Sequence, residues 1–365
     1  MRIARITPIA VSLPLTRPLN LASSPLAAVE NVFVKMETDD GLVGWGEASS
    51  APSMTGETVA GMMAAVRHLT PFLIGRDPAA FAANLAEMDR RMYGNASAKT
   101  ALEMAAYDIA GKAVQKPVAE LIGEIRRTRM PVLWMLASGD PDADADDARE
   151  KRDGGFAAFK IKVGGKAVGA DIERALQIRR AADGAQLSAD ANQGWDVDAA
   201  IAFVEGVGDA LDFVEQPVMG HDLDGMARVA RRAKAPIGAD EGLHSMDDIR
   251  RHHALGAAQG GSLKMIKLGG VTRACEAAEL CQSLGMRINI AGKIAESSVA
   301  TAAVVQLAAA APSLDWGLSI TNQYVMADVV RSPIRVRHGH VELPSGAGLG
   351  IEVDEQALLR LAFDA

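Results

Sequence analysis

The sequence predicts a parallel (β/α) barrel that carries an N-terminal α+β domain. From about Pro131 onward, short apolar runs alternate with helical patterns, which is typical of a parallel sheet covered by helices. Before that point the chain has strand patterns followed by helical patterns, which favours a separate α+β unit. Charged residues also recur near the ends of successive runs at steps of roughly 25 residues. One strand, one helix and two loops take about that length in a barrel of ~250 residues.

The N-terminal unit begins with three expected strands and continues with three expected helices. Asp39-Asp40-Gly41 lies between two apolar runs and predicts a hairpin turn. Two segments, residues 20–28 and 48–58, are small, polar and rich in turn residues, a composition typical of loops that cover a site. The expected strands are 1–13, 31–37 and 42–47, and the expected helices are 57–69, 79–92 and 99–115.

Eight strand-like runs follow, with helical patterns between most of them, which favours a barrel over an open sheet. The last segment has alternating Ile334-Arg335-Val336 and a glycine-rich turn, and we expect it to pack on the N-terminal unit. We therefore expect a capping domain (residues 1–125), a barrel (126–325) and a C-terminal segment (326–365). The expected barrel strands are 132–136, 158–163, 187–191, 213–215, 237–239, 261–266, 287–290 and one that starts near Leu314.

Composition and charge argue against several classes of protein. With 49% hydrophobic and 23% charged residues, the chain is ordinary for a soluble globular protein, and its net charge of −8 argues against nucleic acid as a partner. The longest small apolar stretch, residues 299–311, is interrupted by Gln306 and is too short to span a bilayer. The N-terminus has the alternation of a strand rather than a signal peptide. Cys275 and Cys281 form no disulfide framework, so we expect a cytoplasmic protein without a membrane partner.

Three carboxylates, Asp190, Glu215 and Asp240, end or directly follow successive strand-like runs. The carboxyl ends of barrel strands form the active-site face, so we expect these side chains to converge. Oxygen ligands without His or Cys favour a hard ion, Mg²⁺ or alternatively Mn²⁺. Any one of these acids alone is equally well explained as a solvated residue at a strand end. Three at nearly equal spacing favour a metal site.

A lysine stands one unit beyond each end of this series. Lys162 precedes the carboxylates and Lys264 follows them, so we expect the two on opposite sides of the barrel. Lys160 shares a strand face with Lys162. Buried lysines are rare unless they are paired, and the carboxylates on the next strands would supply the partners. Their mutual repulsion, with a dication nearby, is expected to lower the pKa of Lys162 and make its amine a base. Lys267 is three residues after Lys264, so in a strand the two side chains would lie on opposite faces. We therefore expect Lys267 to point away from the site and to have a structural role.

This arrangement suits proton transfer at a carbon next to a carboxylate. Such a carbon holds its proton tightly, and binding the carboxylate to a divalent ion stabilises the enediolate that forms. A lysine on one face removes the proton. A lysine on the other face returns a proton with inversion, or stabilises charge during elimination or ring closure.

Five motifs resemble those of a known superfamily: Lys160-Ile161-Lys162, Asp190-Ala191-Asn192, Glu215-Gln216-Pro217, Asp240-Glu241 and Leu263-Lys264-Met265-Ile266-Lys267-Leu268-Gly269-Gly270. With them the chain resembles the enolase superfamily, in particular its muconate-lactonizing-enzyme subgroup, and Gly44-Trp45-Gly46-Glu47 is similar to the capping domain of that family. The resemblance implies a modified TIM barrel of seven to eight units, a homo-oligomer, and a lysine base acting with Mg²⁺. It implies that Asp190, Glu215 and Asp240 are the metal ligands and that Lys162 and Lys264 are the acid/base pair.

Further residues are expected to support the site or contact the substrate. Glu296 corresponds to a family position near the substrate, and Asn192 and Glu241 adjoin the metal ligands. Lys293 is an additional cation at the same mouth, and it either contacts a second anionic group of the substrate or is a surface lysine. No His lies in the run 287–290, which argues against the mandelate racemase subgroup with its His–Asp pair.

The subgroup holds racemases, dipeptide epimerases, cycloisomerases and a β-eliminating synthase. The loop 52–58 is similar to that of dipeptide epimerases, but the eighth strand reads Asp315-Trp316-Gly317-Leu318 and lacks their ammonium-binding Asp-x-Asp. We therefore expect racemisation or epimerisation of a small carboxylate, such as an N-substituted amino acid. The alternatives are cycloisomerisation of a muconate-like diacid and a β-eliminating synthase or dehydratase.

Two hypotheses from other classes remain open. One is a non-catalytic binding protein on the same fold. Such a protein is expected to lack one of the metal-binding carboxylates or one of the two lysines, and this sequence has them all. A metal-dependent aldolase or hydrolase on an unrelated barrel is the other, and a lysine on each side of the carboxylates argues against it. In every case the substrate side chain is expected to contact the loops 20–28 and 48–58.

Overall fold

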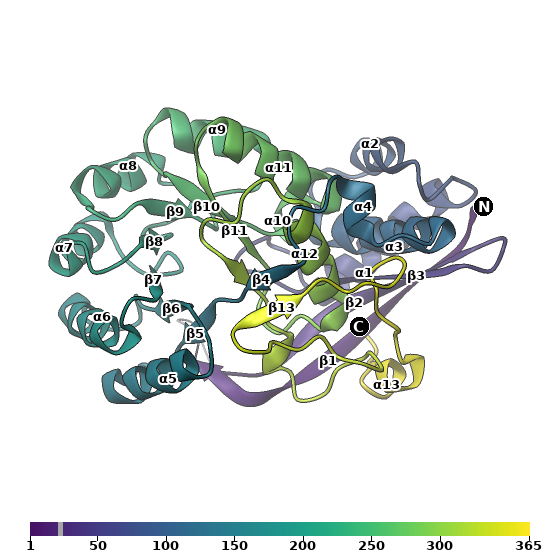
Figure 1. Ribbon diagram of the computed structural model, residues 1–365. Helices are drawn as coiled ribbons and strands as arrows, with labels where there is room; N and C mark the ends of the chain where they lie inside the picture. The colour runs from purple at the N-terminus through teal and green to yellow at the C-terminus, as the bar shows by residue number, and fades with distance from the viewer. Residues whose placement is uncertain (21–24) are drawn as a thin grey trace.

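The computed structural model describes residues 1–20 and 25–365, and its centre is a barrel of eight parallel strands (Figure 1). Each strand pairs with the next along the chain, from β5 to β12, and the predicted α/β barrel is confirmed. The strands are β5 (Trp134–Leu136), β6 (Ala158–Lys162), β7 (Gln186–Asp190), β8 (Phe213–Glu215), β9 (Ile237–Ala239), β10 (Gly260–Leu263), β11 (Arg287–Ala291) and β12 (Leu318–Ser319).

An isolated bridge closes the barrel, and a tryptophan fills one end of it. Val132, just before β5, forms a parallel bridge with Leu318 of β12. Trp316 stacks on Phe213 with ring centroids 4.2 Å apart. The indole also lies against Gly260, and a Cβ atom added to this glycine would come within 2.4 Å of the ring. This end of the barrel is therefore packed, which leaves the carboxyl ends of the strands to form a site.

Helices cover the outside of the barrel and return the chain to the start of the next strand (Figure 1). Asp140, Asp196, Asp222 and Ser245 each begin a helix by accepting a hydrogen bond from a free N–H of its first turn. No helix within residues 1–20 and 25–365 is long and apolar enough to cross a membrane. The helices are α5 (Pro141–Asp153), α6 (Val168–Ala182), α7 (Val197–Val207), α8 (Leu223–Arg232), α9 (Met246–Ala254), α10 (Met265–Leu268), α11 (Val271–Ser283) and α12 (Ser298–Ala310).

The N-terminal domain is a three-stranded antiparallel sheet packed on helices, as predicted. Glycine lets its third strand lie directly on a helix, because a Cβ atom on Gly46 would lie 1.9 Å from the carbonyl oxygen of Ala101. The domain contains β1 (Ile3–Asn20), β2 (Pro25–Thr38), β3 (Val43–Ser49), α1 (Val59–Leu73), α2 (Phe81–Arg91), α3 (Ala96–Val114) and α4 (Val118–Ile122).

The C-terminal segment returns to the beginning of the chain, where the yellow ribbon runs beside the purple one (Figure 1). β13 (His340–Glu342) pairs antiparallel with β4 (Arg129–Pro131). After α13 (Glu355–Arg360), Ala362 forms an antiparallel bridge with Val11 of β1. The bridge at Ala362 ties the segment to the N-terminal sheet, whereas β13 and β4 form a small sheet of their own. The exact domain boundaries near residues 125 and 325 stay a prediction.

The predicted elements differ from the structure mainly at their ends. The run 261–266 is strand only to Leu263, and α10 follows it. Gly269 adopts a φ of 92° and ends that helical turn, which the apolar pattern did not reveal. The expected loop 20–28 is strand up to Asn20 and again from Pro25, and its centre, residues 21–24, lies outside the described residues.

Candidate active site

Strand register brings the predicted residues together at the carboxyl end of the barrel. Lys162 pairs with Asp190 across β6 and β7, and Asp190 pairs with Glu215 across β7 and β8. Asp240 directly follows β9, and Lys264 directly follows β10. β6 and β10 are four strands apart in a barrel of eight, so Lys162 and Lys264 lie on opposite sides. Both line a cavity of about 410 Å³.

Ion pairs connect these lysines to the carboxylates. Lys162 Nζ lies 2.5 Å from Asp190 Oδ2 and donates a hydrogen bond to Asn192 Oδ1 at 2.8 Å. Lys264 pairs with Asp240. Burial alone would raise the pKa of Asp190 and of Asp240, but the neighbouring ammonium groups outweigh it and lower both. Both acids are therefore ionised when the lysines are protonated.

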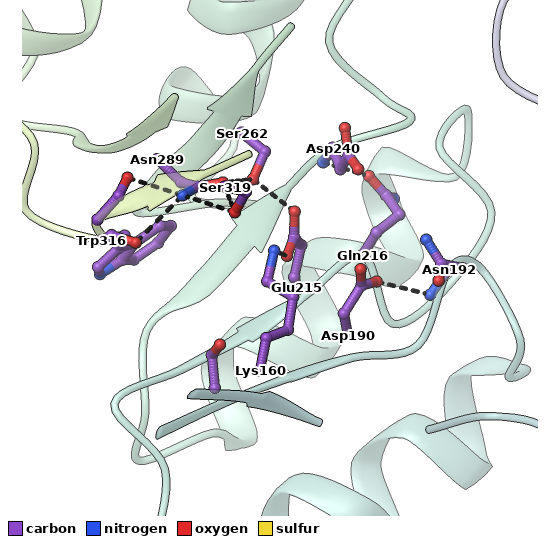
Figure 2. Close-up of polar contacts among 12 residues, drawn as sticks. Lys160, Asp190, Asn192, Glu215, Gln216, Asp240, Ser262, Asn289, Trp316 and Ser319 are labelled. Atoms are coloured by element: carbon purple, nitrogen blue, oxygen red, sulfur yellow. Dashed lines mark hydrogen bonds and ion pairs between the residues drawn. The ribbon is translucent and has the colours of Figure 1, made fainter. Parts of the chain in front are cut away.

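A hydrogen-bonded chain deeper in the barrel holds Glu215 (Figure 2). Lys160 pairs with Glu215 Oε2, and Ser262 Oγ donates to Glu215 Oε1 at 2.5 Å. Ser262 Oγ also lies 3.0 Å from Asn289 Oδ1. Ser262 and Asn289 were not among the predicted site residues. The available signal was that Ser262 precedes Lys264 by two residues, the spacing that puts both on one strand face.

One expectation about the lysines is wrong. Lys267 does not point elsewhere, because its buried ammonium lies 2.5 Å from Asp240 Oδ1. The helical turn α10 explains the error, since residues three apart on a helix share a side. Among the protein's own groups, the charges of Asp190 and Glu215 outweigh the effect of burial and raise the pKa of Lys162. The expected lowering included a neighbouring dication, and it stays a prediction.

The donor chemistry of the site fits a hard divalent cation. Asp190, Glu215 and Asp240 offer only carboxylate oxygens, the ligands that Mg²⁺ prefers. Glu241 adds a buried Oε2 atom that has no hydrogen-bond partner among the described residues. Burial, followed by the charges of Asp240 and Asp190, raises the pKa of Glu241 to about 7. A buried carboxylate oxygen without a donor is costly unless a cation lies beside it.

The carboxylates do not form a closed cluster in this structure. Within residues 1–20 and 25–365, no group of three or more acidic, His or Cys side chains is close enough together to hold an ion. The oxygens of Asp190 and Asp240 face lysine ammonium groups instead. A cation at this site would therefore require Lys162 and Lys264 to move away from the carboxylates.

Left-handed residues shape the loops after two of the barrel strands. Asn192, Gln193 and Gln216 adopt φ angles of 43°, 66° and 36°, a region that residues other than glycine rarely enter. Gln216 Oε1 accepts a hydrogen bond from Asp240 N at 2.8 Å. The strained backbone after β8 thus helps to position the carboxylate that follows β9.

The loop between β11 and α12 contributes Lys293 and Glu296. Lys293 lines the cavity, and Glu296 is buried beside it. Burial and the nearby charge of Glu47 raise the pKa of Glu296 to about 8. Glu47, on β3, accepts hydrogen bonds from Ser297 N and Ala300 N, both at 2.9 Å. This loop is therefore held by the N-terminal domain.

Apolar side chains and hydroxyl groups form most of the remaining cavity wall. The expected covering loop 48–58 contributes Ser53 and Met54. The other wall residues were not predicted, because nothing in their spacing distinguishes them from core residues. They are Leu133, Met135, Gln193, Gly194, Ala291, Gly292, Ile294, Ser319, Ile320, Thr321 and Tyr324.

Asp315 lies at the end of the barrel opposite the cavity. The segment 315–318, which was compared with the Asp-x-Asp of dipeptide epimerases, therefore comes too early in the sequence to line the site. The carbonyl oxygen of Asp315 accepts from Gln186, the first residue of β7, and its carboxylate accepts from Ile288 N near the start of β11. At the cavity end of β12, the residues that line the cavity are instead Ser319 and, just after the strand, Ile320 and Thr321.

Models of known families match both parts of the chain. Residues 4–123 match the N-terminal domain of mandelate racemase / muconate lactonizing enzyme, and residues 143–357 match the enolase C-terminal domain-like family. The chain belongs to the mandelate racemase / muconate lactonizing enzyme family. It is thus a member of the enolase superfamily, whose members generally depend on a divalent metal ion.

Individual relatives span nearly the whole chain. A chloromuconate cycloisomerase of Cupriavidus pinatubonensis is 35% identical over 362 residues, 96% of either protein. An N-succinyl-L-Arg/Lys racemase of Bacillus cereus is 31% identical over 99% of this chain and 98% of its own length, and its crystal structure superposes with a TM-score of 0.95. Muconate lactonizing enzyme from Pseudomonas fluorescens, complexed with muconolactone, is 29% identical and covers 99% of both chains, also with a TM-score of 0.95. This family member is an isomerase.

Proposed function

We propose that this isomerase removes the α-proton of a small carboxylate and returns a proton to the same carbon, as a racemase or epimerase. The observation that carries the proposal is the position of Lys162 and Lys264 on opposite sides of one cavity. Inversion of a carbon requires a proton acceptor on one face and a proton donor on the other. Two lysines facing each other meet that requirement.

The proton transfers involve these two amines. One lysine, as the neutral amine, takes the α-proton, and the electron pair of the C–H bond moves toward the carboxylate to give an enediolate. The opposite lysine, as the ammonium, donates its proton to the other face of the carbon. Asn192 holds Lys162 through the 2.8 Å hydrogen bond and itself donates to Glu241 Oε1 at 3.0 Å, which orients the amine.

Asp190, Glu215 and Asp240 would hold a divalent ion, and we propose Mg²⁺, or alternatively Mn²⁺, because all the donors are carboxylate oxygens. When bound, such an ion supplies positive charge that stabilises the enediolate and replaces the ammonium groups beside the carboxylates. Lys160 keeps Glu215 in place from below through its ion pair.

An N-substituted amino acid is the substrate class that this site favours. The cavity end of β12 carries Ser319, Ile320 and Thr321, none of which is acidic, so it offers no counter-ion to a free ammonium group. The apolar wall, with Leu133 and Met135, suits the remainder of such a molecule. The N-succinyl-L-Arg/Lys racemase of Bacillus cereus, 31% identical, acts on this kind of compound according to its name.

Cycloisomerisation of a muconate-like diacid is the second candidate, because a chloromuconate cycloisomerase is 35% identical over 96% of the chain. In that reaction ring closure generates the enediolate, and one lysine is enough to protonate it. The two candidates differ in their products, since a racemase keeps the carbon skeleton and a cycloisomerase forms a new ring.

Proton NMR in D₂O with Mg²⁺ tests the proposal on N-succinyl, N-acetyl and N-alkyl amino acids, dipeptides and muconates. We expect an α-proton signal to disappear without new product signals. Lys162→Ala and Lys264→Ala should each slow this by about 10³-fold, within the range of general acid–base catalysis. Lys116→Met, at an exposed ion pair with Glu120, is the matched control and should keep the wild-type rate.

New product signals would identify a cycloisomerase or an eliminating enzyme instead. Absence of exchange with every acid, in a protein that binds Mg²⁺, would reject the proposed chemistry in favour of a binding role.

We further propose that the enzyme is a homo-oligomer in the cytoplasm, with no nucleic acid or membrane partner. Cys275 and Cys281 are both free thiols, which suits a reducing compartment. The net charge of −8 argues against nucleic acid. Light scattering of the purified enzyme measures the oligomeric state.

A further inference from the structure

Lys293 differs from the other lysines at the mouth of the barrel. Lys160, Lys162, Lys264 and Lys267 each pair with a carboxylate. Among the side chains that the structure describes, no ion pair or hydrogen bond holds the ammonium of Lys293, although this residue lines the cavity. A cation that faces a binding cavity and forms no ion pair is a candidate for contact with an anionic ligand.

The backbone at Lys293 is well held. Thr321 Oγ1 donates a hydrogen bond to the carbonyl oxygen of Lys293 at 2.6 Å and accepts one from Glu296 N at 3.2 Å. Gly292 N donates to the carbonyl oxygen of Ser319 at 2.8 Å. These bonds fix the loop to the end of β12, so the side chain starts from a defined point beside the cavity. Such fixation favours a binding role over that of a mobile surface lysine.

The charges around Lys293 favour an incoming anion. Glu296 is the nearby carboxyl group, and its raised pKa of about 8 leaves it mostly protonated at neutral pH. The other charged groups that face Lys293 are the cations Lys264 and Lys162. Burial lowers the pKa of Lys293 to about 8; attraction to Glu296 opposes this shift, and repulsion from Lys264 and Lys162 adds to it. A negative group beside Lys293 would relieve this repulsion.

We propose that Lys293 binds a second carboxylate of the substrate, so that this isomerase acts on dicarboxylates. The inference rests on the proposed function, because that function places the first carboxylate at the acidic cluster, next to the carbon that lies between Lys162 and Lys264. Lys293 follows β11, the strand next to β10, so the second carboxylate lies toward that side of the cavity. Both candidate substrate classes have members with this feature. An N-succinyl amino acid has a carboxylate at the end of its acyl group, and a muconate has one at the far end of its carbon chain.

A pair of compounds that differ only in the second charge tests the inference. One is an N-succinyl amino acid, and the other is its N-succinamoyl analogue, in which a neutral carboxamide replaces the distal carboxylate. For wild type we expect a KM that is about 10- to 100-fold lower for the dicarboxylate, as one charge-assisted hydrogen bond allows. Lys293→Met should remove this preference by raising KM for the dicarboxylate alone, with kcat changed only a few-fold. Lys293→Arg, which keeps the charge, should restore most of it.

Three results would overturn the inference. Equal KM values for both compounds in wild type would show that the second charge is not recognised. An equal loss of kcat on both compounds in Lys293→Met would make Lys293 a proton-transfer group. If no acid is turned over, the proposed function fails, and calorimetric titration of wild type and Lys293→Met with both compounds still tests the inference. Equal binding of the pair by wild type would then reject it.

Discussion

Lysines at the mouth of the barrel differ in pKa because each one meets a different set of charges. Lys162 and Lys264 each face several carboxylates, and these outweigh burial and raise the pKa. Lys267 and Lys293 are also removed from water, but attraction from acids does not compensate for burial, and the pKa of each is lowered. Residue type alone therefore says little about protonation here. The arrangement of the acids around each amine decides it.

The lowered pKa of Lys293 predicts how substrate preference depends on pH. The ammonium form is present below about pH 8 and is lost above it. The ratio of kcat/KM for an N-succinyl amino acid to that for its N-succinamoyl analogue should therefore fall as the pH rises through about 8. The ratio cancels the titration of Lys162 and Lys264, which both compounds share. Steady-state kinetics between pH 6 and pH 10, with Lys293→Arg as the matched control, measure it. A ratio that is constant across this range would contradict the prediction.

At the scale of elements, the approach of β3 to α3 depends on the absence of a side chain. A methyl group on Gly46 would meet the backbone of Ala101, which cannot move without shifting the helix. Gly46→Ala should lower the free energy of unfolding by about 3 kcal/mol, the upper part of the usual cost of overpacking. Urea unfolding measures the loss. Gly169→Ala, on α6 where a Cβ atom meets nothing within 4 Å, is the control and should change stability by less than about 1 kcal/mol. Equal stability of Gly46→Ala and wild type would show that the sheet and the helix can separate freely.

Strands that end at a charged residue were the easiest elements to predict. The runs 213–215 and 237–239 coincide with β8 and β9, because an apolar run followed by Glu215 or by Asp240 has a clear end. The run 261–266 does not coincide with β10, because Met265 and Ile266 belong to a helical turn. Both are apolar, and apolar residues are equally common in a buried strand. Apolarity reports burial and does not report the backbone conformation.

The candidate site could be predicted only in part for a related reason. Lysines and acids at strand ends stand out in an apolar sequence, and Asp190 and Lys162 are brought together by strand register alone. Leu133, Ile320 and Tyr324 also line the cavity, but such residues fill the core of any barrel, and only the folded chain shows which of them border the cavity. Catalytic and metal-binding roles stay predictions until variants are measured.

At the scale of the whole molecule, Glu47 joins the N-terminal domain to the barrel. Its buried carboxylate on β3 accepts hydrogen bonds from Asn31 and from Ser297 and Ala300 at the start of α12. Glu47→Ala removes the acceptor for all of these donors, and each buried donor left without a partner costs about 1–3 kcal/mol. We expect a loss of roughly 3 kcal/mol or more in the free energy of unfolding, measured by urea denaturation.

Glu124→Gln, at an exposed position, is the control for this change and should unfold like wild type. If Glu47→Ala also unfolds at the wild-type urea concentration, Glu47 does not hold the two domains together.

The bridge between Val11 and Ala362 has a consequence for protein synthesis. β1 is translated before the barrel, yet Val11 and Leu15 on its outer edge pair with Ala362 and Val325, which are translated after most of the barrel. The barrel is translated in between. The outer edge of β1 around Val11 and Leu15 therefore stays unpaired until these partners are made, and an unpaired strand edge is a site of aggregation. The N-terminal domain thus leaves the ribosome before the barrel does and is completed after it.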